Sequence, residues 1–224
     1  MELKKEFDLE AMLVGECAEG LFQQANAFRE LMMQYRCALM EVETKLNVLN
    51  AEFTMRNNRN PFESIKSRIK TPKSILEKMQ RKGFPLTVES IEENLADVAG
   101  IRVICSFPDD IYTTARMLTD QDDIKVLQVK DYITNPKPNG YRSLHLILEI
   151  PIFLSNEKKG MKVEVQFRTI AMDFWASLEH KLKYKKNIDH AEEISKELRK
   201  CAEASSALDL RMQALRDWIE ECRE

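Results

Sequence analysis

The chain has 224 residues, of which 32% are charged and 44% are hydrophobic, and its net charge is −3. This length suffices for one sizeable domain with helical extensions, and the acidic balance argues against nucleic-acid binding by the whole surface, though not by a local basic patch. The five cysteines show no paired spacing, and the chain has neither a membrane-spanning apolar run nor a signal-peptide core. These features predict a cytoplasmic protein with no membrane partner.

The first predicted element is a long helix from about residue 20 to residue 55; the first fifteen residues are ambiguous. Apolar residues recur along it at alternate steps of four and three, with no internal Gly or Pro: Phe28, Met32, Tyr35, Leu39, Val42, Leu46, Leu49 and Phe53. Such a row either packs on its own domain, which is favoured, or joins subunits.

A basic stretch follows at residues 61–85, where seven Lys or Arg stand against two Glu. Thr71 followed by Pro72 is typical of a helix start. One face of this helix is expected to be buried and another to be polar: Ile75, Leu76 and Met79 on the first, Ser74, Lys78 and Arg81 on the second. Arg68 and Lys70 precede the helix in an extended run. Cationic groups around a helix N-terminus suit a polyphosphate, whereas a plain solvated face is the alternative.

The middle of the chain mixes strands and helices. The expected order is a helix at 89–98, a buried strand at 101–107, a helix at 111–118, a strand at 124–133, a turn at 134–140, a strand at 144–150, a connection at 151–160 and a strand at 161–167. Hairpins mixed with helices predict an α+β fold with a mixed sheet.

The strand at 161–167 has an unusual polar side. Met161, Val163, Val165 and Phe167 alternate with a row of polar residues that consists of Lys162, Glu164, Gln166 and Arg168. This row is either the solvated face of an edge strand or part of a site for a charged ligand and a metal. Thr169 then caps a helix whose apolar face is formed by Phe174, Leu178 and Leu182, with Trp175 beside them.

The last predicted element is a second long helix over residues 191–224. Its apolar row consists of Ile194, Leu198, Cys201, Ser205, Leu208, Met212, Leu215 and Ile219. This row either pairs with the first long helix in antiparallel fashion or joins subunits.

Two carboxylates stand beside basic residues. Asp97 precedes the strand that carries Arg102, and Glu164 lies beside Gln166. Such carboxylates, together with phosphate oxygens, are the usual ligands of Mg²⁺ in phosphoryl or nucleotidyl transfer. Tyr141 follows a glycine in a loop, where its ring is available to stack on a base. The alternative is that these residues are structural: Asp97 ends a helix, Tyr141 is an ordinary aromatic residue of a turn, and His145 is a histidine of the sheet with no catalytic role.

Three groups of residues resemble the (p)ppGpp synthetase domain. They are KPNGYRSLH at 137–145, EVQFRT at 164–169 and the set Arg68, Lys70, Ser74, Lys78 and Arg81. The segment AMDFWASLEH at 171–180 is similar to the small, single-domain alarmone synthetases in particular. The resemblance covers roughly residues 60–185. It implies a nucleotidyltransferase-like α+β domain at 57–187, flanked by an N-terminal helical extension (1–56) and a C-terminal helix (188–224).

The resemblance implies a Mg²⁺-dependent GTP pyrophosphokinase of the stringent response. ATP would be bound by Arg68, Lys70, Ser74, Lys78, Arg81 and Arg102. GTP or GDP would be bound by Lys137, Asn139, Tyr141, His145 and Gln166, with Tyr141 stacked on guanine. Asp97 and Glu164 would be catalytic and hold Mg²⁺, and Glu164 would also accept the proton of the 3′-hydroxyl. A homotetramer is implied as well.

One position departs from the family pattern. Some relatives have Asn at the position of Asp173, where it helps to bind a pppGpp activator. A carboxylate that faces a polyphosphate is unfavourable without a metal. We therefore expect this protein to lack strong activation by pppGpp.

Other functions are compatible with parts of the sequence. A regulatory module that binds guanine nucleotide or single-stranded RNA is the main alternative, although such a module needs no metal-binding carboxylates. An alarmone hydrolase is disfavoured because the three His residues form no His-Asp metal cluster, and a structural coiled coil leaves the middle of the chain unexplained.

Overall fold

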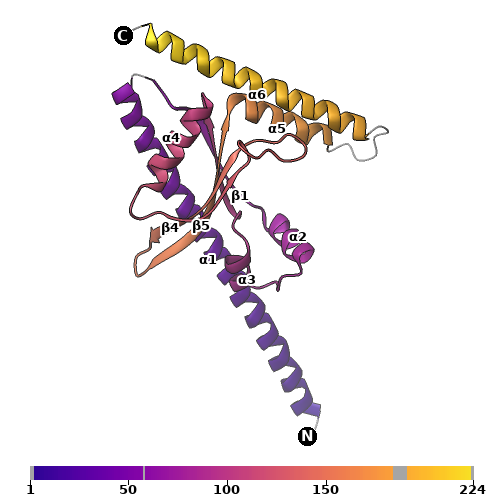
Figure 1. Ribbon diagram of the computed structural model, residues 1–224. Helices are drawn as coiled ribbons and strands as arrows, with labels where there is room; N and C mark the ends of the chain where they lie inside the picture. The colour runs from indigo at the N-terminus through magenta and orange to yellow at the C-terminus, as the bar shows by residue number, and fades with distance from the viewer. Residues whose placement is uncertain (1–2, 58, 184–190, 223–224) are drawn as a thin grey trace.

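The computed structural model describes residues 3–57, 59–183 and 191–222, with side chains for 23–56, 59–182 and 192–222 (Figure 1). In chain order its elements are α1 (Leu3–Asn57), β1 (Phe62–Ile69), α2 (Pro72–Lys82), α3 (Val88–Asn94), β2 (Ala99–Cys105), α4 (Pro108–Thr119), β3 (Lys125–Asp131), β4 (Leu144–Phe153), β5 (Lys158–Thr169), α5 (Ile170–Lys183) and α6 (Ala191–Glu221). None of the described helices combines the length and the apolar character needed to cross a membrane.

The strands of the described chain form one mixed sheet in the order β1-β2-β5-β4-β3. β2 and β5 run parallel, and the other neighbouring strands run antiparallel. The predicted α+β fold with a mixed sheet is confirmed. Because β5 lies in the centre and is paired on both sides, its polar row is not the solvated face of an edge strand.

The two faces of the sheet differ in chemistry. Val163, Val165 and Phe167 of β5 are fully buried on one face, together with their apolar neighbours on β2 and β4. This face is covered by α1 and α4, as the ribbon diagram shows (Figure 1). The alternate residues of β5 project from the other face, which is therefore the place where polar side chains gather.

The apolar row of α1 is buried within the chain. Tyr35 is 1% exposed, Val42 and Leu46 are fully buried, and α1 contacts β1, β2, β4 and β5. The favoured interpretation, packing on its own domain, is thus confirmed for this row. The helix is longer than predicted, since it begins at Leu3 rather than near residue 20.

The start of α2 matches the sequence signal. Thr71 Oγ1 accepts a hydrogen bond from Ser74 N, Pro72 is the first helical residue, and Gly83 ends the helix in the left-handed conformation (φ 69°). The predicted burial of Leu76 is wrong, because its side chain is 44% exposed. Only the narrower row of Ile75 and Met79 is buried in the core.

The segment at 151–160, expected to be a connection, is mostly strand. β4 continues to Phe153 and β5 begins at Lys158, so the two strands form a long hairpin. Its turn is closed by a 2.8 Å hydrogen bond from Leu154 N to Glu157 O. Backbone pairing extends this hairpin although most of its side chains at 153–158 are exposed, which is why an apolar pattern does not reveal it.

The start of α5 matches the sequence signal, but its apolar face was assigned wrongly. Thr169 Oγ1 accepts a hydrogen bond from Met172 N (3.1 Å) and caps α5 as predicted. Trp175 is only 5% exposed. The predicted apolar row is exposed by 64%, 41% and 53% at Phe174, Leu178 and Leu182, respectively. The reason is that α6 packs on the side of α5 that carries Trp175.

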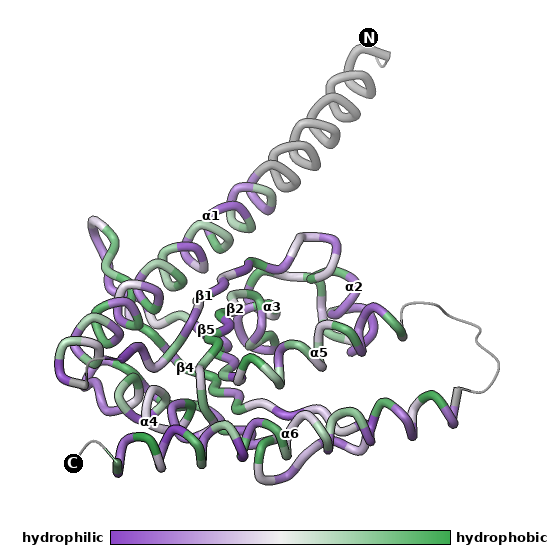
Figure 2. Tube along the Cα trace, turned by 90° about the horizontal axis from the view of Figure 1, so that it is seen from above, coloured by the Kyte–Doolittle hydropathy of each residue, from purple (hydrophilic) through white to green (hydrophobic). Residues whose placement is uncertain are grey.

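α6 also turns its predicted apolar row outward. Ala202 and Asp209 face the protein, with 4% and 7% of their surface exposed, whereas Leu208, Met212 and Ile219 are at least half exposed. Apolar residues recur along the outer side of the helix (Figure 2). α6 packs on α5 and α4 rather than pairing with α1 along its length. Antiparallel pairing of the two long helices, one of the two alternatives for this row, is therefore not found in the described chain.

Candidate active site

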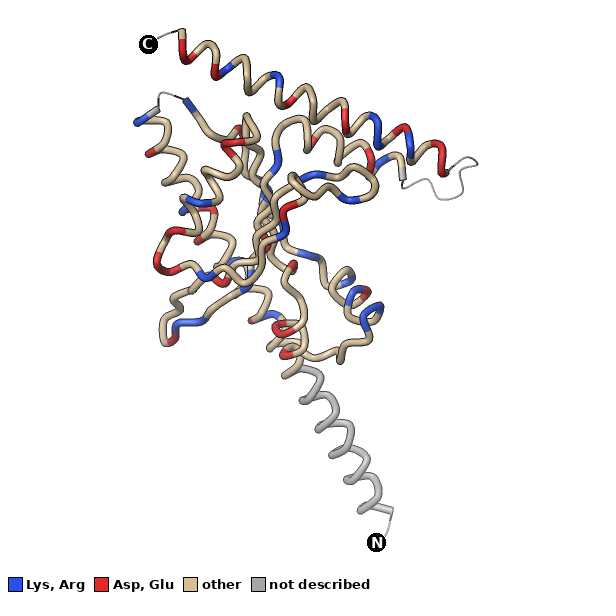
Figure 3. The backbone as a smooth tube through the Cα atoms, in the orientation of Figure 1, with Lys and Arg blue, Asp and Glu red and all other residues tan. Residues whose placement is uncertain are grey.

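The polar residues of β5 organise the open face of the sheet. Strand register places Glu164 beside Gly100 of β2, and places Gln166 between Arg102 of β2 and His145 of β4. Because neighbouring positions in a sheet point to the same face, these side chains form one continuous polar surface. Figure 3 shows that charged residues of both signs meet in this part of the sheet.

A chain of hydrogen bonds runs across this surface. Arg168 Nη2 donates to the Tyr141 hydroxyl oxygen (2.9 Å), which lies 2.9 Å from His145 Nε2; His145 Nδ1 lies 3.2 Å from Glu164 Oε1. An ionised carboxylate only accepts, so Nδ1 of His145 carries the ring proton, and in the neutral ring Nε2 accepts from the Tyr141 hydroxyl. This series of hydrogen bonds therefore ends with His145 donating to the Glu164 carboxylate.

Glu164 is held as an anion. Burial raises the pKa of its carboxyl, but hydrogen bonds from His145 and from Gln166 (Nε2 to Oε2, 2.9 Å) outweigh burial and keep that pKa below its usual value. The charge of Asp97 acts in the opposite direction and raises the pKa of Glu164. An ionised, half-buried carboxylate at this position can bind a cation or accept a proton from a reacting group.

The loop at residues 137–141 carries Tyr141, whose side chain is half-buried. Gly140 has φ 90°, a conformation that favours glycine, and its N–H donates to Lys137 O (2.8 Å). Lys137 Nζ lies 4.6 Å from the Tyr132 ring centre and 5.0 Å from the Tyr141 ring centre. Asn139 Nδ2 donates to Glu179 of α5 (3.0 Å). The loop thus brings a cation and two aromatic rings to one edge of the polar surface.

Asp97 forms the centre of a second cluster, at the end of β1 and beside α2. Its Oδ2 accepts a hydrogen bond from Lys70 Nζ (2.5 Å), and Oδ1 lies 2.8 Å from Lys78 Nζ. Burial raises the pKa of Asp97, but the two lysines outweigh burial and lower that pKa below its usual value. The structure therefore brings together Lys70, Lys78 and Asp97, which the sequence placed on three separate segments.

Two arginines share one carboxylate at the start of α5. Asp173 Oδ1 lies 2.8 Å from Arg168 Nη1 and 3.2 Å from Arg102 Nη1. Burial and the charge of Arg168 lower the pKa of Arg102. The Nε atoms of Arg102 and Arg168 are buried without a hydrogen-bond partner. The side chain of Arg102 is still partly exposed, and an anionic ligand bound to it would relieve the repulsion between the two guanidinium groups.

The remaining predicted ATP ligands are more exposed. Arg68 projects from β1, and with Arg102 and Gln166 it lines a shallow hollow of about 100 Å³. Ser74 is tied into the cap of α2, where its hydroxyl accepts from Thr71 (3.0 Å). Arg81 is exposed near the end of α2. Arg68 thus borders the polar surface, and Ser74 and Arg81 share a face of α2 with Lys78.

The carboxylates fit Mg²⁺ by the chemistry of their donors. No cluster of three or more His, Cys, Asp or Glu suited to a metal occurs in the described residues. Mg²⁺, however, commonly takes only one or two protein carboxylates and completes its shell with phosphate and water. Asp97 Oδ1 is buried and accepts no hydrogen bond of good geometry. Asp97 and Glu164 therefore fit a metal that arrives with a nucleotide rather than a preformed protein cage.

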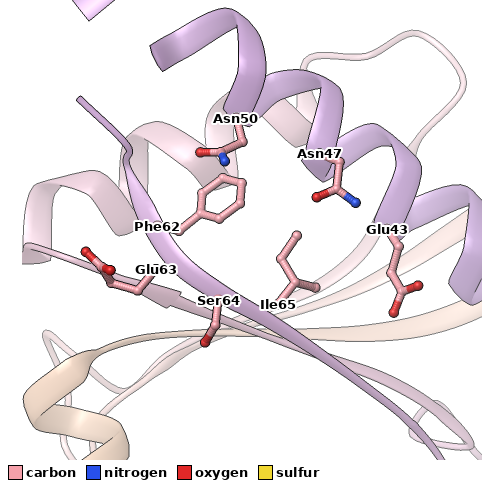
Figure 4. Close-up of a pocket in the computed structure, with 7 residues that line it drawn as sticks. All are labelled: Glu43, Asn47, Asn50, Phe62, Glu63, Ser64 and Ile65. Carbon is pink, nitrogen blue, oxygen red and sulfur yellow. The ribbon is translucent and has the colours of Figure 1, made fainter. Parts of the chain in front are cut away.

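A larger hollow of about 370 Å³ lies elsewhere, between α1 and β1 (Figure 4). Its lining includes Glu43, Asn47 and Asn50 of α1, and Glu63 and Ser64 of β1. None of the predicted site residues lines it, and its lining includes no Lys, Arg or His. This hollow does not suit a nucleotide phosphate.

Two residues of the site were not predicted. The Tyr132 ring packs edge to face on the His145 ring, with ring centres 5.4 Å apart, and it also contacts the ammonium group of Lys137. Glu179 anchors the loop through Asn139. Tyr132 follows directly after β3, where a strand pattern gives no signal of function, and Glu179 lies on a helix face that the sequence presents as solvated.

Comparison with known proteins agrees with this geometry. Residues 67–189 match the family described as the region found in RelA / SpoT proteins, and the chain belongs to that family. It is 44% identical to the GTP pyrophosphokinase YwaC of Bacillus subtilis (strain 168), over 84% of this chain and 90% of that one. It is 36% identical to the GTP pyrophosphokinase YjbM of the same organism, over 88% and 92%.

Solved structures give the same result. Small alarmone synthetase 2 from Bacillus subtilis superposes with a TM-score of 0.76 at 44% identity, over 85% of this chain and 98% of that one. Small alarmone synthetase 1 from Bacillus subtilis, bound to its product pppGpp, superposes with a TM-score of 0.77 at 36% identity, over 86% and 97%. The resemblance predicted from the motifs is confirmed.

Proposed function

We propose that the chain is a GTP pyrophosphokinase that makes the stringent-response alarmones. It transfers the β,γ-pyrophosphate of ATP to the 3′-hydroxyl of GTP or GDP, forms pppGpp or ppGpp, and releases AMP. One observation carries the proposal. The Lys70–Asp97–Lys78 cluster and the series of hydrogen bonds that ends at Glu164 lie at the same open face of the sheet.

The cationic side of this face is the proposed ATP site. Lys70, Lys78 and Arg102 lie partly buried, at 16%, 25% and 31% side-chain exposure, which strengthens their attraction for phosphate relative to fully solvated groups. Arg68, Ser74 and Arg81 border them. The start of α2 adds its free N–H groups and its dipole. Together these groups bind and orient the triphosphate.

The aromatic side is the proposed acceptor site. Tyr141 stacks on guanine, and Lys137, Asn139, His145 and Gln166 hold the nucleotide. For the base to stack, Lys137 moves away from the Tyr141 ring, where its ammonium group now lies 5.0 Å from the ring centre. The displaced cation is then close enough to pair with an acceptor phosphate.

Glu164 and Asp97 are the proposed catalytic carboxylates. The 3′-oxygen of the acceptor attacks the β-phosphorus of ATP, the bond from that phosphorus to the α,β-bridging oxygen breaks, and AMP leaves. Glu164 takes the proton of the 3′-hydroxyl, and His145 keeps the carboxylate oriented. When bound by Asp97 and Glu164, Mg²⁺ neutralises charge on the phosphates.

A homo-oligomer, and specifically a tetramer, is also proposed. Large apolar residues are exposed on the outer sides of α5 and α6: Ile170, Phe174, Leu178, Leu182, Leu208, Met212, Leu215, Trp218 and Ile219. Extended exposed apolar surfaces mark sites of protein association. ATP and GTP are available in the cytoplasm, which is where we place the reaction.

The domain limits remain a proposal as well: a synthetase domain at 57–187, with helices at 1–56 and 188–224. Binding of single-stranded RNA also stays a prediction. Lys73, Arg81 and Lys82 are exposed on α2 and available for it, whereas Lys70 and Lys78 are paired with Asp97.

Separation of nucleotides on an anion-exchange column tests the proposed reaction. The protein is mixed with ATP, Mg²⁺ and either GDP or GTP. AMP is expected to form in equal amount with a guanosine nucleotide that has gained two phosphates, and only when the acceptor is present. Formation of ADP and phosphate, without any new guanosine nucleotide, would show hydrolysis instead.

A further inference from the structure

The acceptor loop, residues 137–141, is pressed against α6. A Cβ atom placed on Gly140 would lie 2.6 Å from Ala202 Cβ and 3.5 Å from Arg199 Cα. Ala202 is only 4% exposed. The loop and the helix thus meet without space for one additional carbon atom, and the shape of the loop depends on where α6 lies.

The loop has other restraints as well, since the Tyr141 hydroxyl is hydrogen-bonded to Arg168 and His145. Its internal hydrogen bonds join Lys137 N to Tyr141 O (3.1 Å) and Gly140 N to Lys137 O (2.8 Å). Outside the loop, Asn139 donates to Glu179 of α5. Lys137 and Asn139 are exposed or half-exposed on a turn, whereas Gly140 is closely packed against Ala202.

α6 in turn is held by two hydrogen bonds to α5 and by one to Thr169, the last residue of β5. Trp175 Nε1 donates to Leu198 O (2.8 Å), Ser205 Oγ donates to Ala171 O (3.2 Å), and Thr169 Oγ1 donates to Asp209 Oδ2. Ala202 lies between these contacts in the sequence of α6. A rigid support therefore stands directly behind Gly140, next to Tyr141.

We propose that α6 positions the guanine-nucleotide acceptor and that Ala202 is the positioning residue through which it acts. The inference rests on the proposed function, since it assigns the 137–141 loop to the acceptor. Ala202 touches Gly140 rather than the nucleotide. It sets the place of the Tyr141 ring and leaves the Lys70–Asp97–Lys78 cluster unaffected.

Replacement of Ala202 by a larger residue tests this role. Ala202→Leu is expected to raise the KM for GDP by about tenfold or more, because overpacking displaces the loop, while the KM for ATP stays unchanged. Ala207→Leu is the matched control: it adds the same side chain to an exposed position of α6, about 140° around the helix. Equal rises in both KM values, or an unchanged KM for GDP in the folded Ala202→Leu variant, would overturn the proposal.

A second pair of variants covers the case in which Ala202→Leu does not fold. Gly140→Ala is expected to weaken binding of a fluorescent GDP analogue, because its Cβ meets Ala202. Adding Ala202→Gly removes the opposing carbon and is expected to restore much of that binding, the remaining deficit reflecting the positive φ. No recovery in the double variant would overturn the role of Ala202.

The same binding measurements separate this inference from the proposed reaction. If the variants change GDP binding while the unchanged chain transfers no pyrophosphate, the proposed reaction is overturned and the positioning role is supported. Absence of any GDP binding by the unchanged chain would overturn both. Normal transfer by Gly140→Ala, with normal GDP binding, would overturn the positioning role alone.

Discussion

His145 Nδ1 lies 3.2 Å from Glu164 Oε1, across the pairing of β4 with the central strand β5. Through the other nitrogen of the same ring, this contact extends to the Tyr141 hydroxyl. The ring proposed to stack on the acceptor base is therefore connected by two hydrogen bonds to the carboxylate proposed to take the acceptor's proton. This connection makes the roles of the three residues separable by mutation.

Glu164→Gln is expected to lower turnover by about 10²–10⁴-fold, because an amide neither accepts the proton nor binds Mg²⁺ well. The amide oxygen still accepts a hydrogen bond from His145, so the variant should fold. Steady-state rates and GDP binding check the prediction. Glu149→Gln, on β4 outside the proposed site, is the matched control. A near-normal rate in Glu164→Gln would remove this residue from its role.

Tyr141→Ala is expected to weaken acceptor binding more than ATP binding. Loss of stacking corresponds to about 1–3 kcal/mol, or roughly tenfold to a hundredfold in Kd. Tyr141→Phe keeps the ring and removes only the hydroxyl that contacts His145 and Arg168, so its loss should be smaller. Titration calorimetry with GDP and with a non-hydrolysable ATP analogue measures both affinities. Equal losses for the two ligands would contradict stacking on guanine.

Added pppGpp is expected to leave the initial rate unchanged. Asp173 is paired with Arg102 and Arg168, and its carboxylate offsets part of the attraction of these arginines for a polyphosphate. Rates measured with and without pppGpp check the expectation, and Asp173→Asn is the matched comparison. If pppGpp stimulates only the Asp173→Asn variant, the negative charge of Asp173 is what prevents activation of the unchanged chain. A several-fold rise in the unchanged chain would contradict the expectation.

Asp209→Asn is expected to raise the free energy of unfolding at neutral pH. Burial raises the pKa of Asp209, and its hydrogen bond with Thr169 offsets burial only in part. The folded state thus binds this proton more tightly than the unfolded state, so the ionised form is destabilising. A pKa raised by one unit corresponds to about 1.4 kcal/mol.

The advantage of Asp209→Asn should shrink as the pH falls through the raised pKa of the folded state towards the unfolded value of about 3.9, below which Asp209 becomes protonated in both states. Thermal unfolding between pH 4 and pH 8 measures the effect. Asp122→Asn, at an exposed position, should show a difference that does not vary in this way. A constant difference for Asp209→Asn across the pH range would argue against a raised pKa.

Local signals predicted local structure well. The alternation at 161–168 gave β5 and its polar side, and Thr71 with Pro72 gave the start of α2. These patterns depend only on nearby residues and backbone geometry. The pairing of Asp97 with Lys70 and Lys78 joins separate segments, and it is set by the fold rather than by a spacing in the sequence.

Apolar rows were less informative, because they predict that a surface is covered but not what covers it. The row of α1 is buried on its own sheet. The rows predicted on α5 and α6 are largely exposed, although the row of α6 has the same spacing as that of α1, since Trp175 and Ala202 occupy the contact between α5 and α6 instead. Tyr132 was not predicted for a related reason, because Lys137 and His145 become its neighbours only in the folded chain.

Transfer of label tests the central claim most directly. The protein is incubated with γ-³²P-ATP, Mg²⁺ and GDP or GTP, and the nucleotides are then separated. We predict a labelled ppGpp or pppGpp product, with the label in its 3′-pyrophosphate, that is lost in Glu164→Gln. Label found only in phosphate or unreacted ATP, while the chain still binds guanine nucleotide, would contradict the synthetase and support a regulatory binding module.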